Sequence, residues 1–194
     1  MEDNEKFEPL DLGMLESELE RESYKRRYRS VLWSTVSALI VVAAAAALLA
    51  MLFLPVLQIE GSSMTESLRD GDVVVALNGK QFDAGDVVAF YFGNDILVKR
   101  VIAGPGDWVD IDADGNVYVN ESLMDEPYVT EKSKGTCDIE FPYQVPDGRF
   151  FVMGDHRETS IDSRSTAVGC ISRDMVLGRI IGRVWPLDGF GGID

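Results

Sequence analysis

An uncharged, apolar run from Val31 to Leu57 constrains this chain more than any other feature. The run is about 27 residues long, whereas about 20 residues suffice for a helix to cross the hydrocarbon core of a bilayer. Its centre, residues 41–49, is apolar on every side, which suits contact with lipid better than the one-faced packing of a globular helix. The sequence therefore predicts one membrane-spanning helix.

The charges on either side of this run predict its orientation. Basic residues cluster at positions 25–29, and no Lys or Arg follows the run until Arg69. Because positive charge favours the cytoplasmic side, the N-terminus is expected inside and the rest of the chain outside. A cleaved signal peptide would have an apolar core of only about 7–15 residues, so an uncleaved single-pass anchor in the cell membrane is favoured. The expected parts are a cytoplasmic acidic head with its basic cluster (1–30), a transmembrane anchor (31–57) and an extracytoplasmic domain (58–194).

Composition excludes several classes of function. The chain has 194 residues and a net charge of −15, with no basic stripe that could neutralise phosphates, so a nucleic-acid partner is not expected. Acidic residues crowd the first 22 positions, which predicts a solvated, disordered head. The chain has one histidine, His156, and two cysteines, too few for the usual set of zinc ligands. Neither a structural metal nor another cofactor is therefore expected. A disulfide between Cys137 and Cys170 stays open, because spacing alone does not settle it.

After the apolar run, the hydrophobic pattern changes to the two-residue period of β-strands. Asp114-Gly115 separates two such runs and predicts a tight hairpin. Together these signals predict a mainly β domain, either barrel-like or built from several small packed sheets. The expected strands are 72–77, 86–92, 96–102, 108–112, 116–120, 150–153 and 176–184.

Two stretches could carry chemistry, Gly61-Ser62-Ser63-Met64 and the lysine at position 99. A serine hydroxyl needs a base, and the candidates are His156 and Lys99. A solvated lysine has a pKa near ~10.4, but burial among apolar neighbours can lower it by several units. Strand alternation places Lys99 on the face of Leu97 and Val101. Taken singly, the first stretch could also be a turn at the membrane exit, and Lys99 a protective lysine on an edge strand.

Taken together, the motifs resemble those of bacterial type I signal peptidases, the membrane-bound enzymes that remove signal peptides from exported proteins. The family order is an anchor, Gly-x-Ser-Met, Gly-Asp-Val-Val, Lys-Arg-Val-Ile-x-Gly-Pro-Gly-Asp and Gly-Asp-x-Arg-x-x-Ser-x-Asp-Ser-Arg. The same order occurs here, at residues 61–64, 85–88, 99–107 and 154–164.

The resemblance implies roles for individual residues. It makes Ser63 the nucleophile, whose backbone N–H helps to form the oxyanion hole, and Lys99 the general base. It makes Ser160 the residue that hydrogen-bonds and orients the lysine, Asp162 and Arg164 a bracing salt bridge, and Asp155 part of the same support. It also implies an acyl-enzyme and signal peptides of exported preproteins as substrates, cut after small residues in an Ala-x-Ala-like sequence. The residues expected to shape the substrate pockets are Ile59, Met64, Leu68 and Val98.

The sequence also departs from the family pattern after the nucleophile. Thr65-Glu66-Ser67 stands where x-Pro-Thr is usual, and Glu66 would raise the pKa of Lys99 if it came close. An alternative reading is a non-catalytic assembly factor for surface fibres on the same fold. Such members usually lack part of the dyad, so the presence of both Ser63 and Lys99 favours the enzyme.

Overall fold

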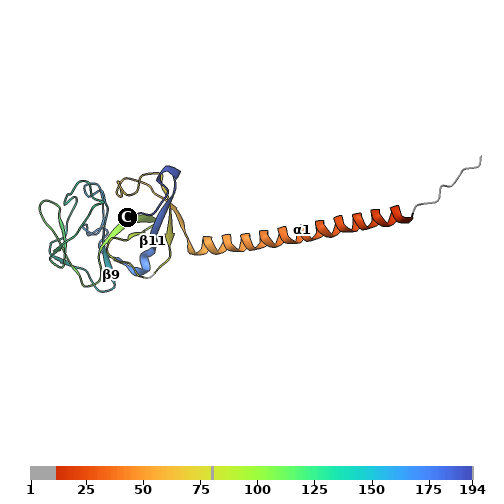
Figure 1. Cartoon of the computed structure of the whole chain (residues 1–194). Coiled ribbons are helices and arrows are strands. Elements are labelled where there is room, and N and C mark those ends of the chain that lie inside the picture. The colour runs from red at the N-terminus through yellow and green to blue at the C-terminus, as the bar shows by residue number, and fades with distance from the viewer. Residues whose placement is uncertain (1–11, 80, 194) are drawn as a thin grey trace, which may run out of the picture. The chain divides into compact units, whose positions relative to one another are not determined.

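The computed structural model describes residues 12–79 and 81–193, which form two compact units, a helix and a β-rich domain, divided after Ala50. The helix α1 (Leu12–Phe53) has 42 residues and runs without a break (Figure 1). Its segment Glu20–Leu49 is long and apolar enough to cross a membrane, judged by length and composition. That segment is also exposed throughout, as a lipid-facing helix would be.

The helix differs from the prediction at both ends. The described part of the acidic head, from Leu12 onward, is helical rather than disordered, and residues 1–11 lie outside the described residues. Extending a helix already nucleated costs little, and the Glu22–Lys25 pair at 3.1 Å supports the added turns. At the other end α1 stops at Phe53, before the expected Leu57, because Pro55 lacks an N–H and disfavours helix in the residue before it.

The β-rich domain contains two antiparallel sheets. The larger has the strand order β1-β2-β11-β3-β4-β9-β10 and the smaller β7-β6-β5-β8. Two 3₁₀ turns, η1 (Arg173–Met175) and η2 (Leu187–Gly189), precede and follow β11. The strands are β1 (Val56–Gln58), β2 (Val73–Leu77), β3 (Val87–Phe92), β4 (Asp95–Ala103), β5 (Trp108–Ile111), β6 (Val117–Val119), β7 (Ser122–Leu123), β8 (Tyr143–Gln144), β9 (Arg149–Met153), β10 (Ile171–Ser172) and β11 (Val176–Trp185).

The mainly β class is confirmed, and of the two expected forms the structure has packed sheets rather than a closed barrel. Every predicted strand is present, and its ends lie within one residue of the prediction. β5 and β6 form the expected hairpin, in which Gly115 adopts a φ of +81° that few other residues tolerate. The unpredicted strands β1, β7, β8 and β10 have two or three residues, too few to show a period.

Three apolar clusters hold the domain together. One joins the two sheets, since it contains Ile102 and Phe151 of the larger sheet and Val109 of the smaller. The other two lie on opposite faces of β3, so that Val87 belongs to one and Val88 to the other. Fully burying one such side chain contributes about 1.5–3 kcal/mol, so these clusters make a rigid base for the loops that they support.

Both cysteines are free. Cys170 is buried in the cluster that joins the sheets, and the half-buried Cys137 directs its thiol at the carbonyl oxygen of Ile139, 3.5 Å away. The pairing that the sequence left open is therefore not formed.

Candidate active site

The loop between β1 and β2 carries Ser63 and is fixed at its ends and in its middle. The Ile59 N–H donates to the Asp72 carbonyl oxygen at 2.8 Å. Gly61 turns the chain with a φ of +89°, and its N–H donates to Asp70 Oδ1 at 2.7 Å. Met64, directly after the serine, is buried in an apolar cluster. Ser63 thus sits on a loop with a defined path, and Asp70 is a contributor that the sequence motifs did not indicate.

Lys99 Nζ donates a hydrogen bond to Ser63 Oγ at 2.7 Å. The lysine lies on β4, an interior strand of the larger sheet, opposite Val88 of β3, and only 3% of it is exposed. Burial is the main cause that lowers the pKa of Lys99, and the positive charge of Arg164 lowers it further. The negative charges of Asp162 and Asp155 act in the opposite direction, but the net result is a lowered pKa. Lys99 is therefore a buried amine poised against a hydroxyl, not a protective lysine on a sheet edge.

His156, the other candidate base, does not contact the Ser63 hydroxyl through its ring. Its Nδ1 lies 3.0 Å from Thr159 Oγ1. Its backbone N–H instead donates to the Ser63 carbonyl oxygen at 3.1 Å. His156 thus positions the nucleophile through its main chain. Within residues 12–79 and 81–193 the Ser63 N–H has no acceptor, so it is free to donate to a ligand.

Arg100, the residue after Lys99, ties three segments together. Its guanidinium forms a bidentate pair with Asp155, with Nε–Oδ1 and Nη2–Oδ2 distances of 3.0 and 2.8 Å. Ser67, on the nucleophile loop, donates to Asp155 at 2.5 Å and accepts from Arg100 at 3.1 Å. The ring of Tyr128 covers the guanidinium at 3.8 Å. The expected support by Asp155 thus acts through Arg100 and Ser67, neither of which was singled out from the sequence.

Asp162 and Arg164 form the expected kind of contact, a fully buried ion pair with an Nη2–Oδ2 distance of 2.9 Å. Asp162 also accepts the Gly154 N–H, and Arg164 donates to the carbonyl oxygen of Lys134. Burial alone would raise the pKa of Asp162, but the hydrogen bonds and charge of Arg164 outweigh it and hold that pKa below its usual value. Asp162 therefore stays ionised and braces the loop of residues 154–164.

A third buried pair, Glu126 with Arg157, holds the same loop at an Nη2–Oε1 distance of 2.5 Å. Arg157 also donates through Nε to the Gly154 carbonyl oxygen at 3.1 Å. The sequence motif includes the arginine but gives no sign of its partner, which lies 31 positions earlier.

Ser160 is buried, and its hydroxyl has no hydrogen-bond partner in the part of the chain that the structure describes. The hydrogen bond to Lys99 that the resemblance implies is thus not formed here, and Lys99 Nζ bonds Ser63 Oγ. Ser160 packs against Gly154, where an added side chain would also come within 2.5 Å of the Ser63 carbonyl oxygen. A glycine is needed at position 154 for this close approach.

A cleft of about 360 Å³ opens beside Ser63 and Lys99. This nucleophile cleft is lined by residues 57–61, 63–64 and 95–99. Three of the expected pocket residues, Ile59, Met64 and Val98, are among them. Leu68 is not, because it is fully buried and packs in the same apolar cluster as the other three.

Glu66 does not act on the base. Its carboxylate is exposed and lies 3.7 Å from the exposed Arg69. The charges that shift the pKa of Lys99 are Asp162, Arg164 and Asp155, and Glu66 is not among them. Among the described residues, no group of three or more His, Cys, Asp or Glu side chains could hold a metal ion.

A desolvated amine hydrogen-bonded to a serine hydroxyl is the arrangement of a serine hydrolase site that uses lysine in place of histidine. Comparisons with known proteins agree. Residues 32–185 match the family model described as Signal peptidase, peptidase S26, and the chain belongs to that family. The resemblance stated from the motifs is thereby confirmed.

Individual relatives show the extent of the similarity. The chain is 38% identical over 152 residues to Signal peptidase IB of Staphylococcus aureus, covering 68% of this chain and 78% of that protein. It is 32% identical over 145 residues to Thylakoidal processing peptidase 1, chloroplastic, of Arabidopsis thaliana, covering 66% and 41%. A crystal structure of a signal peptidase I from Enterococcus faecalis aligns at 29% identity and a TM-score of 0.42, over 52% of this chain and 97% of that one.

Substitution of Glu126 tests the buried pairs. Glu126→Gln leaves the Arg157 charge buried without its counter-charge, which should lower the free energy of unfolding by about 3–5 kcal/mol. The matched control, Glu66→Gln, removes an exposed pair and should cost less than about 1 kcal/mol. Denaturant unfolding followed by tryptophan fluorescence measures both. Equal losses in the two variants would contradict a structural role for the Glu126–Arg157 pair.

Proposed function

We propose that this signal peptidase family member removes signal peptides from exported preproteins through an acyl-enzyme on Ser63, with Lys99 as the general base. The observation that carries the proposal is the 2.7 Å contact between Lys99 Nζ and Ser63 Oγ, made by an amine whose pKa is lowered by burial. A neutral amine at this distance can accept the hydroxyl proton.

The reaction follows from this geometry. Neutral Lys99 takes the proton of Ser63, whose oxygen attacks the scissile carbonyl carbon to give a tetrahedral intermediate. The backbone N–H of Ser63 donates to the developing oxyanion. The Lys99 ammonium then gives its proton to the leaving amine, and the peptide bond breaks to leave an ester on Ser63. Lys99 next takes a proton from water, whose oxygen attacks the ester carbonyl. The Lys99 ammonium then returns this proton to Ser63 Oγ as the C–O bond breaks and the signal peptide leaves.

The nucleophile cleft supports a preference for small side chains before the scissile bond. Ile59, Met64 and Val98 give it apolar walls, and Leu68 in the same cluster keeps them in place. Small apolar residues fit between such walls, and an Ala-x-Ala-like sequence supplies them at alternate positions of an extended chain.

We further propose that α1 anchors the enzyme in the bilayer as a single span, with the N-terminus in the cytoplasm and the β-rich domain outside. The segment Glu20–Leu49 is long and apolar enough to span a bilayer, and the basic residues 25–29 lie near its N-terminal end, which supports this topology. Anchoring would hold the site near emerging signal peptides, which raises their effective concentration.

Cleavage of a synthetic signal-peptide substrate in detergent tests the nucleophile and the base. Ser63→Ala should abolish product, and Lys99→Met should lower kcat by about 10²–10⁴. Ser62→Ala removes the neighbouring, exposed hydroxyl and should keep activity near that of the unchanged protein. If the folded, unchanged protein yields no product, the enzyme proposal fails and the assembly-factor alternative takes its place.

The pH dependence of kcat/KM tests the state of Lys99. Only the neutral amine is a base, so the rate should rise with pH as Lys99 loses its proton. Because burial lowers the Lys99 pKa, the midpoint should lie below the 10.5 of a free lysine, and the rate should fall tenfold per pH unit on the acidic side. Glu66→Gln should leave the midpoint unchanged. A midpoint at the free-lysine value would argue against a desolvated base.

The topology can be tested by adding protease to cells whose cell membrane is intact and whose outer layers have been removed, so that the protease reaches the outer face of that membrane. The β-rich domain should be accessible from outside, whereas a tag at the N-terminus should be digested only after the membrane is broken. The reverse pattern would contradict the proposed orientation, and release of the protein by carbonate washing would contradict the anchor.

A further inference from the structure

A second cleft, of about 450 Å³, adjoins the nucleophile and shares no lining residue with the nucleophile cleft. We call it the polar cleft. The residues of its lining that matter here are Thr65, Glu66, Glu131, Lys132, His156 and Glu158.

Ser63 lies in the wall between the two clefts. The chain passes from the lining of the nucleophile cleft at Met64 to the lining of the polar cleft at Thr65. The Ser63 hydroxyl is bonded to Lys99, which lines the nucleophile cleft. Its carbonyl oxygen accepts the N–H of His156, which lines the polar cleft. The two clefts therefore lie on either side of Ser63, so an extended polypeptide that reaches Ser63 through the nucleophile cleft has the polar cleft ahead of it.

We propose that the polar cleft binds the residues that follow the scissile bond, the first residues of the mature protein, and selects them by charge. The inference rests on the proposed function, since it takes Ser63 as the atom that attacks the substrate. Residues before the bond occupy the apolar nucleophile cleft, and residues after it meet a polar lining, which matches the change from signal peptide to soluble mature chain.

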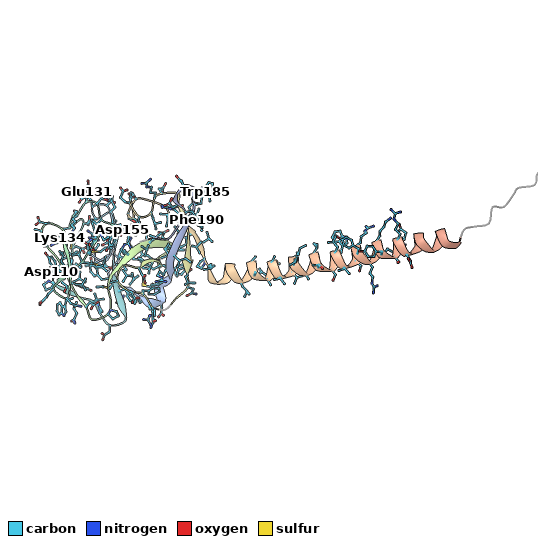
Figure 2. The ribbon with its side chains drawn as sticks, viewed as in Figure 1. Asp110, Glu131, Lys134, Asp155, Trp185 and Phe190 are labelled. Carbon is cyan, nitrogen blue, oxygen red and sulfur yellow. The ribbon has the colours of Figure 1, made fainter. Side chains whose placement is uncertain are left out.

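The charge that this cleft presents is negative. Asp155 and Arg157 also line it, but each is buried and paired, with Arg100 and with Glu126. Figure 2 shows this contrast, with Asp155 inside the domain and Glu131 at its periphery. The exposed charged groups of the lining are three carboxylates and one ammonium. The carboxylates belong to Glu66, Glu131 and Glu158, and the ammonium belongs to Lys132.

The local partners of these groups do not cancel that excess. Lys132 donates to the neutral Asn116 at 2.9 Å, and Glu158 accepts from the neutral hydroxyl of Ser133 at 2.6 Å. Glu66 has a single loose ion pair with Arg69 at 3.7 Å, in which both side chains are exposed. The polar cleft thus favours Lys or Arg early in the mature sequence and disfavours Asp or Glu.

Three synthetic substrates test the inference. They share one signal sequence and differ at the second and third positions after the scissile bond, which are Lys, Gln or Glu. In the full-length enzyme in detergent at low ionic strength, kcat/KM should follow the order Lys, Gln, Glu. Glu131→Gln should reduce the Lys-to-Glu ratio by about 1.5- to 5-fold, the range of an exposed ion pair, and replacing Glu66 and Glu158 as well should reduce it by about tenfold. Glu140→Gln makes the same charge change at an exposed position outside both clefts and should leave the ratio unaltered.

The outcomes separate this inference from the proposed function. Cleavage of the Gln substrate reports on the Ser63 reaction alone, and if it is not cleaved the proposed function fails first. If it is cleaved but the Lys and Glu substrates react equally, the charge selection is wrong. If Glu140→Gln and Glu131→Gln change the Lys-to-Glu ratio of kcat/KM equally, the preference comes from the net charge of the protein. That result would overturn the assignment to the polar cleft. A ratio unaltered in Glu131→Gln and in the triple variant would overturn it as well.

Discussion

The contact between Lys99 and Ser63 depends on which groups pair with the neighbouring buried carboxylates. Three buried carboxylates lie near the site, and each is hydrogen-bonded to an arginine, so none is bonded to Lys99 among the described residues. A buried ammonium without a bonded counter-ion is disfavoured, and its pKa falls. Arg100 and Arg164 therefore do more than brace loops, because they bind Asp155 and Asp162, the two carboxylates whose charge favours the ammonium form of Lys99. The three pairs are Arg100–Asp155, Arg157–Glu126 and Arg164–Asp162.

Such an arrangement contributes little to stability by itself. Removing charged groups from water costs about as much as their attraction returns, so buried pairs are weak evidence for stabilisation. The apolar clusters on the two faces of β3 and between the sheets supply the driving force instead. They also fix the strand that carries Lys99 and the loop that carries Ser63, which is why a 2.7 Å contact can be kept between residues 36 positions apart.

Sequence reasoning predicted the regular elements well, since two-residue alternation marks strands such as β3 and β4 directly. It also indicated Ser63 and Lys99, because motifs keep chemical groups at fixed local spacing. It did not indicate Glu126, whose partner Arg157 lies far along the chain, since such pairing is decided by tertiary packing. The helical start at Leu12 was missed for a related reason, because a long helix extends into polar sequence that composition alone would describe as disordered.

The segment that departs from the family pattern shows how one local restraint can replace another. A proline after the nucleophile would stiffen the backbone by fixing φ. Here Thr65 donates both its N–H and its hydroxyl to the Ser62 carbonyl oxygen, at 3.2 and 2.9 Å. Ser67 then bonds the buried Asp155–Arg100 pair. Because the Ser67 bonds end on side chains that are themselves immobilised by burial, the loop keeps the Ser63 hydroxyl on Lys99 without the proline. Glu66 meanwhile lines the polar cleft and is exposed.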